Sequence, residues 1–357
     1  MTRIALFLDG TKNTSSSETN IYRLYQNTKT EGQIKAYFPG VGTSNFFTSF
    51  YHAIFACGIK DIIHRAYDFL SEKYDPGDTI YLFGFSRGAF EVRALVGFLN
   101  TCGLRKNNEV STKRLWKYFE STHRNETLEP LDVLAKQPKE ILKGIQRDIV
   151  ENCLQVKIQF VGIFDAVSAD SKANNYMFGQ NQEMIERIVH AMALDEQRGF
   201  FPVLAFKYPR PVRLGINPTS RELIEQRWFV GVHSHVGGGF SKDDVLSRIP
   251  LQWMQQEATK AGLKQDVIQL TGDEHQLGAS QMNLDMYQRV LRWFKFDERE
   301  IGRSVIMNET IDRTVFERYQ NDVMNYNPKN LEGFAKRCGL CLNEIQPATR
   351  YTNGENY

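Results

Sequence analysis

The chain has 357 residues, of which 41% are hydrophobic and 24% are charged, a composition typical of one large or two ordinary globular domains. The formal net charge is only +2 and the two signs are interspersed, so charge predicts no nucleic acid partner. The five cysteines are odd in number and scattered, which argues against a disulfide framework. Cys338 and Cys341 lack the second pair or nearby histidines that a zinc site needs, and their role is left open.

Four apolar runs predict the strands of a mostly parallel sheet covered on both faces, because each run is apolar throughout rather than alternating. The runs are IALFLD, TIYLFGFS, VKIQFVGIFD and RWFVGVH, which end at Asp9, Ser86, Asp165 and His233. Helical patterns cover residues 58–74, 88–104 and 182–197. Strands that alternate with helices predict an α/β fold.

Longer segments define the predicted domain organisation. Residues 105–150 are polar with a helical pattern, and we expect them to form a helical insertion beside the sheet, or a cap over the site. Residues 1–254 would form the catalytic core. Residues 255–357 would form a mixed, mainly helical extension packed on that core, with one helix over 286–296.

The sequence contains no convincing membrane or export signal. The apolar stretch FFTSFYHAIFACGI at 46–59 is shorter than the roughly 20 residues that a spanning helix needs. It predicts a core helix, and the alternative is an aromatic lip that touches lipid. The apolar run that begins at Ile4 is too short for a signal peptide, which predicts a cytoplasmic location in the producing cell.

A serine stands between two glycines where the second predicted strand meets a predicted helix, in the motif GFSRG at 84–88. This context is typical of the nucleophile elbow of α/β-hydrolases, in which a strained turn pushes the serine hydroxyl out of the sheet. Gly84 and Gly88 would allow the strand and the helix to approach each other closely. The motif therefore predicts Ser86 as a nucleophile on an α/β-hydrolase-like fold.

A serine hydroxyl needs a histidine to take its proton and an acid to hold that histidine. Asp165 and His233 follow Ser86 in the order that α/β-hydrolases use, and both end strand-like runs. We therefore expect all three side chains at one edge of the sheet. His235 is the competitor for the histidine role, although the HVGGG sequence indicates that the chain has left the strand by that residue.

The oxyanion of a tetrahedral intermediate needs two backbone donors. We expect one to be the amide of Arg87, directly after the serine, and the other to be the amide of Gly10 or Thr11 in the loop after the first strand. For Asp9 and Thr11 the alternative is ordinary hydrogen bonding within that loop.

Seven blocks together resemble the uncharacterised α/β-hydrolase family that supplies the catalytic domain of type VI secretion phospholipase effectors. The blocks are FLDGTKNT, TNIYRLYQ, YFPGVGT, GFSRGAF, VGIFDAVSA, HAMALDEQRGFFP and WFVGVHSHVGGGF, in the family's order. The resemblance implies a serine esterase or lipase whose triad maps onto Ser86, Asp165 and His233. The family usually has aspartate where this chain has His235, which leaves open what supports the loop after His233.

The resemblance also implies parts of the substrate pocket. The block at 190–202 would line it through His190, Asp195 or Arg198, and the alternative is a helix packed on the sheet with a surface ion pair. Asp9 and His235 are further pocket candidates.

We therefore expect a serine hydrolase that cleaves carboxylic esters, with phospholipids as the leading substrate class, and that needs no cofactor. Its expected partners are an ester substrate, a transient membrane contact, and an immunity or secretion carrier protein if the chain is exported by type VI secretion. One alternative is a metal-dependent hydrolase that uses His233, His235, Asp9 and Asp243 or Asp244 as ligands. Another is a binding module without activity on a hydrolase fold.

Overall fold

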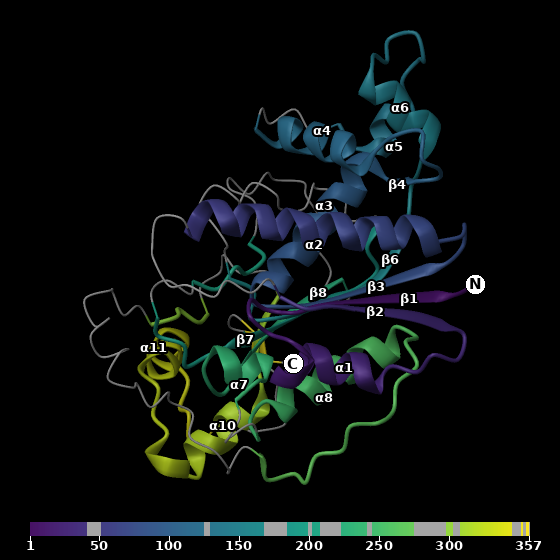
Figure 1. The fold of residues 1–357 in the computed structure, drawn as a ribbon. Coiled ribbons are helices and arrows are strands. Elements are labelled where there is room, and N and C mark those ends of the chain that lie inside the picture. Colours follow the sequence, from purple (N-terminus) through teal and green to yellow (C-terminus); the bar gives the residue numbers. More distant parts are fainter. Residues whose placement is uncertain are drawn as a thin grey trace.

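The computed structural model (Figure 1) describes most of the chain. The described residues are 1–40, 51–124, 129–167, 184–198, 202–207, 223–240, 245–274, 298–302, 308–344, 351–352 and 355–356. Within these ranges the side chains of 51–57, 123–124, 351–352 and 355–356 are not described.

A seven-stranded sheet in the order β2-β1-β3-β6-β7-β8-β9 forms the centre of the molecule. Every neighbouring pair in it is parallel. The strands are β1 (Arg3–Leu8), β2 (Gln33–Phe38), β3 (Thr79–Phe85), β6 (Ile158–Phe164), β7 (Ile188–Ala193), β8 (Ile224–Phe229) and β9 (Glu309–Ile311). The predicted α/β architecture with a mostly parallel sheet is confirmed, and it is consistent with an α/β-hydrolase-like fold.

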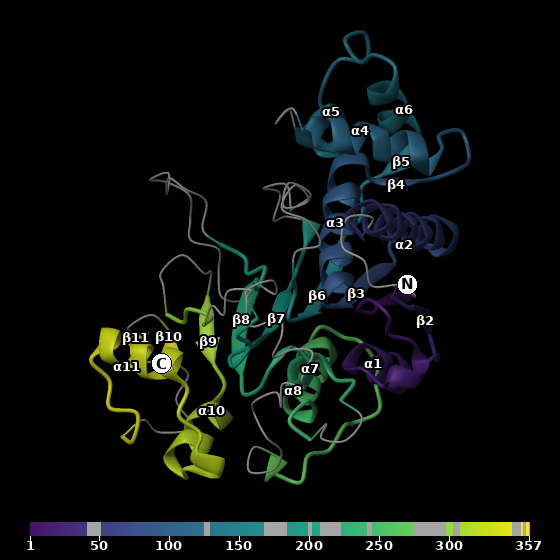
Figure 2. The ribbon, with the colours of Figure 1, turned by 60° about the vertical axis from the view of Figure 1, so that its left-hand side comes forward.

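Helices cover both faces of the sheet (Figures 1 and 2). One face carries α2 (Tyr51–Lys73) and α3 (Arg87–Cys102), and the other carries α1 (Asn20–Asn27), α7 (His233–Gly237) and α8 (Arg248–Lys260). Side chains of β1 alternate between two hydrophobic clusters, with Ile4 and Leu6 in one and Ala5 and Phe7 in the other. Because successive strand residues point to opposite faces, this alternation builds two cores from one apolar strand.

Two of the three predicted helices are confirmed, and the third is wrong. The patterns at 58–74 and 88–104 correspond to α2 and α3, and α3 is capped by Gly103 at a φ of 68°. The pattern at 182–197 instead contains the strand β7, which pairs with β6 and β8. All six residues of β7 are buried. A central parallel strand buries both faces, so its apolar run lacks alternation and matches helical spacing by coincidence.

The predicted insertion lies between α3 and β6. Its elements are β4 (Leu104–Arg105), α4 (Thr112–Arg124), α5 (Leu131–Leu134), α6 (Ile145–Asn152) and β5 (Cys153–Leu154), and β4 pairs with β5. It stands at the top of Figure 1. Since α3 starts at Arg87 and a helix rises about 1.5 Å per residue, the insertion begins on the order of 24 Å along the helix axis from Ser86. The insertion packs on α2 and α3 and begins at the end of α3 opposite Ser86, and its predicted place beside the sheet or over the site stays a prediction.

Residues beyond 254 contribute to the sheet as well as to its surroundings. They include β9, the helices α10 (Arg313–Gln320) and α11 (Lys329–Cys338), and the short pair β10 (Tyr351–Thr352) and β11 (Glu355–Asn356). The division at residue 254 stays a prediction, and the predicted helix at 286–296 lies outside the described residues. Among the helices that the structure describes, none has the length and apolar character needed to span a bilayer.

Candidate active site

Ser86 occupies a strained turn between β3 and α3. Its φ of 57° and ψ of −118° lie where residues other than glycine are rarely found. A Cβ atom at Gly84 would lie 2.5 Å from the carbonyl oxygen of Gly88, and one at Gly88 would lie 2.2 Å from the carbonyl oxygen of Leu8. Both positions therefore require glycine, and the turn holds the serine side chain at the carboxyl edge of the sheet.

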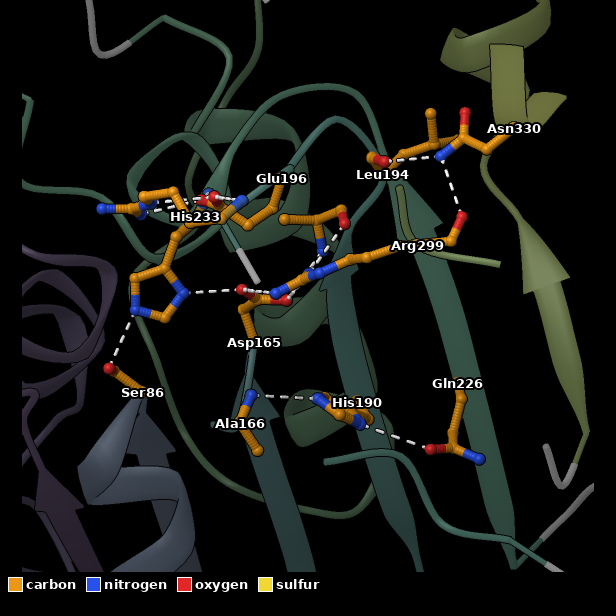
Figure 3. Close-up of polar contacts among 12 residues, drawn as sticks. Ser86, Asp165, Ala166, His190, Leu194, Glu196, Gln226, His233, Arg299 and Asn330 are labelled. Carbon is orange, nitrogen blue, oxygen red and sulfur yellow. Dashed lines mark hydrogen bonds and ion pairs between the residues drawn. The ribbon is translucent and has the colours of Figure 1, made fainter. Parts of the chain in front are cut away.

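Three side chains form a continuous hydrogen-bonded chain at this edge (Figure 3). Ser86 Oγ lies 2.8 Å from His233 Nε2, and His233 Nδ1 lies 2.6 Å from Asp165 Oδ2. The structure therefore brings together the three residues predicted as the triad, although they are up to 147 positions apart in the sequence. All three are buried, with exposed fractions of 7% for Ser86, 6% for His233 and 0% for Asp165.

Each of these residues follows a different strand of the sheet. Asp165 comes directly after β6 with a φ of 36°, and its amide donates to the carbonyl oxygen of Ala191 in β7 at 2.7 Å. His233 does not end a strand, because β8 stops at Phe229 and three residues lead to the start of α7. Its ring packs against Phe85, with the ring centroids 4.7 Å apart.

Arg299 is the main site residue that the sequence did not reveal. Its Nη1 donates to Asp165 Oδ1 at 2.5 Å and its Nη2 donates to Oδ2 at 3.0 Å. Burial alone would raise the pKa of Asp165, but the Arg299 guanidinium and the hydrogen bond from His233 outweigh it and hold that pKa well below its usual range. The sequence signal was indirect, since a fully buried carboxylate needs a cationic partner but the pattern does not say which one.

The loop after β1 is built around the carboxylate of Asp9. Asp9 accepts hydrogen bonds from the Gly10 amide at 2.7 Å and the Thr19 hydroxyl at 2.6 Å. It also accepts from the Tyr37 hydroxyl at 2.8 Å. Burial raises the pKa of Asp9, and these hydrogen bonds partly offset the rise. The Asp9 carboxylate is therefore a hydrogen-bond acceptor that holds the loop in its conformation.

The same loop approaches the serine. A Cβ atom at Gly10 would lie 3.2 Å from Ser86 Cβ, so the Gly10 backbone stands next to the predicted nucleophile. The amide of Gly10 is engaged by its neighbour Asp9. The Thr11 hydroxyl is buried and has no hydrogen-bond partner among the described residues.

His190 lies in β7, beneath the triad, and is fully buried. Its Nε2 accepts from the Ala166 amide at 3.2 Å, and its Nδ1 therefore donates to Gln226 Oε1 at 3.3 Å. Burial lowers the pKa of His190 to about 3, so the ring is neutral near pH 7. His190 thus contacts the backbone of the residue that follows Asp165.

His235 lies in α7, two residues after His233. Its Nδ1 accepts from the Val232 amide at 3.3 Å, and its ring stacks on Phe240 with centroids 4.8 Å apart. These contacts tie α7 to Val232, the residue before it, and to Phe240, which follows it.

Residues of the block that follows β7 support the turn that carries His233. Glu196 Oε2 accepts from the His233 amide at 3.2 Å and is paired with Arg198 at 2.7 Å. Asp195 Oδ2 accepts from the Gly231 amide at 2.6 Å, and Asp195 also accepts from the Tyr326 hydroxyl at 3.1 Å. The sequence had pointed to Asp195 and Arg198 as pocket candidates, whereas no motif singled out Glu196 or Tyr326.

Asp195 predicts a pH dependence of stability. Burial raises its pKa to about 7, so the folded protein retains a proton there that the unfolded chain has lost above about pH 4. The stability linked to this proton is present below the unfolded pKa and is lost as pH rises through about 7. The loss is on the order of 4 kcal/mol. We expect the free energy of unfolding of Asp195→Asn to decrease less than that of the wild type between pH 4 and pH 8. The difference should be about 4 kcal/mol, and urea unfolding at each pH measures it.

Glu309 provides the matched control, because burial raises its pKa to about 7 as well. Glu309→Gln should remove its own part of the slope and leave the part due to Asp195. An Asp195→Asn protein with the full pH slope of the wild type would contradict the expectation.

The residues considered as metal ligands do not converge in the part of the chain that the structure describes. There, no group of three or more histidine, cysteine, aspartate or glutamate side chains is arranged to hold a metal ion. Asp243 and Asp244 lie outside the described residues. Cys338 and Cys341 are both thiols, the second of them exposed.

The parallel sheet and the serine turn define an α/β protein consistent with an α/β-hydrolase-like fold. The family described as T6SS, phospholipase effector Tle1-like, catalytic domain matches residues 2–257, and the chain belongs to this family. The resemblance of the seven sequence blocks to the catalytic domain of type VI secretion phospholipase effectors is thereby confirmed.

One curated protein is similar over part of its length. The chain is 32% identical over 225 residues to the uncharacterized protein YEL023C of Saccharomyces cerevisiae, and the match covers 57% of this chain. The matched part is 32% of the yeast protein, so the chain spans about a third of the length of that relative.

Two solved structures are similar at low identity. An uncharacterized protein from Pseudomonas aeruginosa is 16% identical with a TM-score of 0.45, over 91% of this chain and 55% of that chain. The Tle1 effector bound to the VgrG spike from the type 6 secretion system is 18% identical with a TM-score of 0.35, over 68% of this chain and 51% of that chain. Because these TM-scores are low, the fold assignment rests on the sheet of this chain itself.

Proposed function

We propose that the protein is a serine hydrolase that cleaves carboxylic ester bonds of phospholipids through an acyl-enzyme. The observation that carries the proposal is the hydrogen-bonded chain from Ser86 through His233 to Asp165 at a strained strand-to-helix turn. A serine on such a turn, bonded to a histidine that an acid holds, is the arrangement that nucleophilic ester hydrolysis requires.

In the proposed reaction, Ser86 Oγ attacks the acyl carbonyl carbon while His233 Nε2 takes the hydroxyl proton. Asp165, bonded to His233 Nδ1, fixes the tautomer and stabilises the imidazolium. His233 then returns the proton to the leaving alcohol oxygen, which releases the alcohol and leaves an acyl-serine. Water attacks that ester with His233 as base again, the acid departs and the Ser86 hydroxyl is restored.

The oxyanion donors that we propose are the backbone amides of Arg87 and Thr11. Arg87 directly follows the proposed nucleophile and is the first residue of α3, the position that supplies one oxyanion donor in hydrolases with such a serine turn. Of the two candidates in the loop after β1, Gly10 already donates to Asp9, which favours Thr11. The N-terminal end of α3 also favours the negative charge that develops there.

The choice of a phospholipid substrate is supported by the family, whose description names a phospholipase effector of type VI secretion. Export by that machinery, a carrier protein such as the spike that the Tle1 effector binds, and an immunity protein are further proposals at this level. The aromatic segment at 46–55 is the proposed lipid contact, and its side chains lie outside the described residues.

Two measurements on the intact chain test the proposal. We expect a fluorophosphonate probe to label one site in the folded protein, with the mass shift on the peptide that contains Ser86. We also expect vesicles of mixed phospholipids to yield free fatty acid and lysophospholipid, with a short soluble ester as the reference substrate.

The outcomes separate the alternatives. If only the soluble ester is cleaved, the proposed esterase activity stands and the proposed phospholipid substrate is rejected. Absence of labelling in a protein that unfolds cooperatively would favour a binding module. Activity that chelators abolish and metal restores, without labelling of Ser86, would favour the metal-dependent hydrolase.

A further inference from the structure

Arg299 lies in a segment that the family match does not include, because that match ends at residue 257. It nevertheless reaches the centre of the site. The guanidinium contacts both oxygens of Asp165, and its Nη1 also donates to the carbonyl oxygen of Ala193 at 2.8 Å. The Arg299 side chain is 5% exposed and that of Asp165 is 0% exposed, so this ion pair is shielded from solvent.

The backbone around Arg299 is anchored to the sheet and to α11. Asn330 Nδ2 donates to the carbonyl oxygens of Arg299 at 3.2 Å and of Leu194 at 2.8 Å (Figure 3). Arg337, also in α11, donates to the carbonyl oxygen of Ile301. These contacts fix the guanidinium relative to the end of β7, so it can define the position of the Asp165 carboxylate rather than follow it.

The chemistry of the triad depends on this carboxylate in two ways. Asp165 must be ionised to stabilise the imidazolium, and one of its oxygens must face His233 Nδ1. A fully buried carboxylate without a counter-charge favours its protonated form, which cannot provide this stabilisation. A planar guanidinium that binds both oxygens satisfies the charge and restricts rotation of the carboxylate at the same time.

We propose that Arg299 is a positioning residue of the active site, which orients and keeps ionised the aspartate that holds the catalytic histidine. The inference rests on the proposed serine hydrolase function and deepens it. The segment around residue 299 therefore completes an active centre whose other members lie within the family match.

The test compares Arg299→Met and Arg299→Lys in the full chain on a short soluble ester, with kcat and KM measured from pH 5 to 9. In Arg299→Met we expect kcat to fall by about 10- to 100-fold while KM changes little, the size of effect seen when a residue that orients a metal-binding side chain is removed. We expect the acid limb of kcat to move upward in pH, because Asp165 loses the counter-charge that holds its pKa low and is then protonated more readily. Arg299→Lys should restore the acid limb but only part of kcat, since an ammonium cannot bind both oxygens in the same way.

Arg227→Met is the matched control. Arg227 also pairs with a carboxylate of the C-terminal part, Asp312 at 3.4 Å, and is largely buried, but none of its described contacts is to the triad. It should lower stability without moving the acid limb.

Specific results would overturn the proposal. An Arg299→Met protein with wild-type kcat and an unshifted acid limb would reject it. If Arg299→Met does not fold, Arg299→Lys decides, because an unchanged kcat there would reject the two-point contact. If Ser86→Ala keeps full activity, the proposed serine hydrolase function is wrong. If Ser86→Ala is inactive and Arg299→Met is unchanged, only the proposed role of Arg299 is rejected.

Discussion

Ser86→Ala is expected to lower kcat for hydrolysis of a short soluble ester by about a millionfold, the size of effect that loss of a catalytic serine has in other hydrolases. The reason is that Ser86 Oγ is the hydroxyl bonded to His233 Nε2, so alanine removes the proposed nucleophile. The side chain lies on a turn whose backbone the two flanking glycines define, so alanine should fold there. Fluorophosphonate labelling should disappear in the same variant.

Ser71→Ala is the control for this experiment. Ser71 lies in α2, where its hydroxyl donates to the carbonyl oxygen of Tyr67 at 2.9 Å, away from the triad. It should retain both activity and labelling. A Ser86→Ala protein with more than about one hundredth of wild-type kcat would contradict a covalent mechanism at Ser86, since a triad serine contributes far more than that.

Asp165→Asn is expected to have the second largest effect, with kcat about 10⁴-fold lower, because an amide cannot hold His233 in the tautomer that accepts the serine proton. It should also destabilise the fold by about 3–5 kcal/mol, since the buried Arg299 would lose its counter-charge. Steady-state kinetics and urea unfolding at pH 7 measure the two effects separately.

The stability effect of Asp165→Asn has a defined pH dependence. The folded pKa of Asp165 is held below its usual range, so its contribution is present above the unfolded pKa of about 4 and is lost as pH falls further. The difference in unfolding free energy between wild type and variant should therefore be constant from about pH 8 to 5 and shrink toward about pH 3.

Asp78→Asn is a suitable control, because Asp78 is a buried aspartate at the opposite edge of the sheet, where it accepts from the Thr2 amide at 2.6 Å. It should lower stability and leave kcat unchanged. If Asp165→Asn retained kcat, or if its destabilisation grew at low pH, the assigned role of Asp165 would be wrong.

The local sequence determined the strands β1, β3 and β6, the serine turn and the candidate triad. β1, β3 and β6 are continuous apolar runs, and GFSRG carries the turn chemistry within five residues. Because the carboxyl ends of parallel strands lie at one edge of a sheet, the residues that follow such runs are expected near one another. This is why Ser86, Asp165 and His233 could be selected together from the order of the chain.

Only the tertiary structure showed that residues 188–193 form a strand, β7. It also showed which residues support the turn that carries His233, and which side chain pairs with Asp165. β7 is a strand because β6 and β8 flank it, which its own apolar pattern does not record. Arg299 is 134 residues from Asp165 and stands in a charged stretch without a motif. The physical reason is that periodicity and turn chemistry are local, whereas the counter-charge of a buried carboxylate depends on which distant segment the fold brings to it.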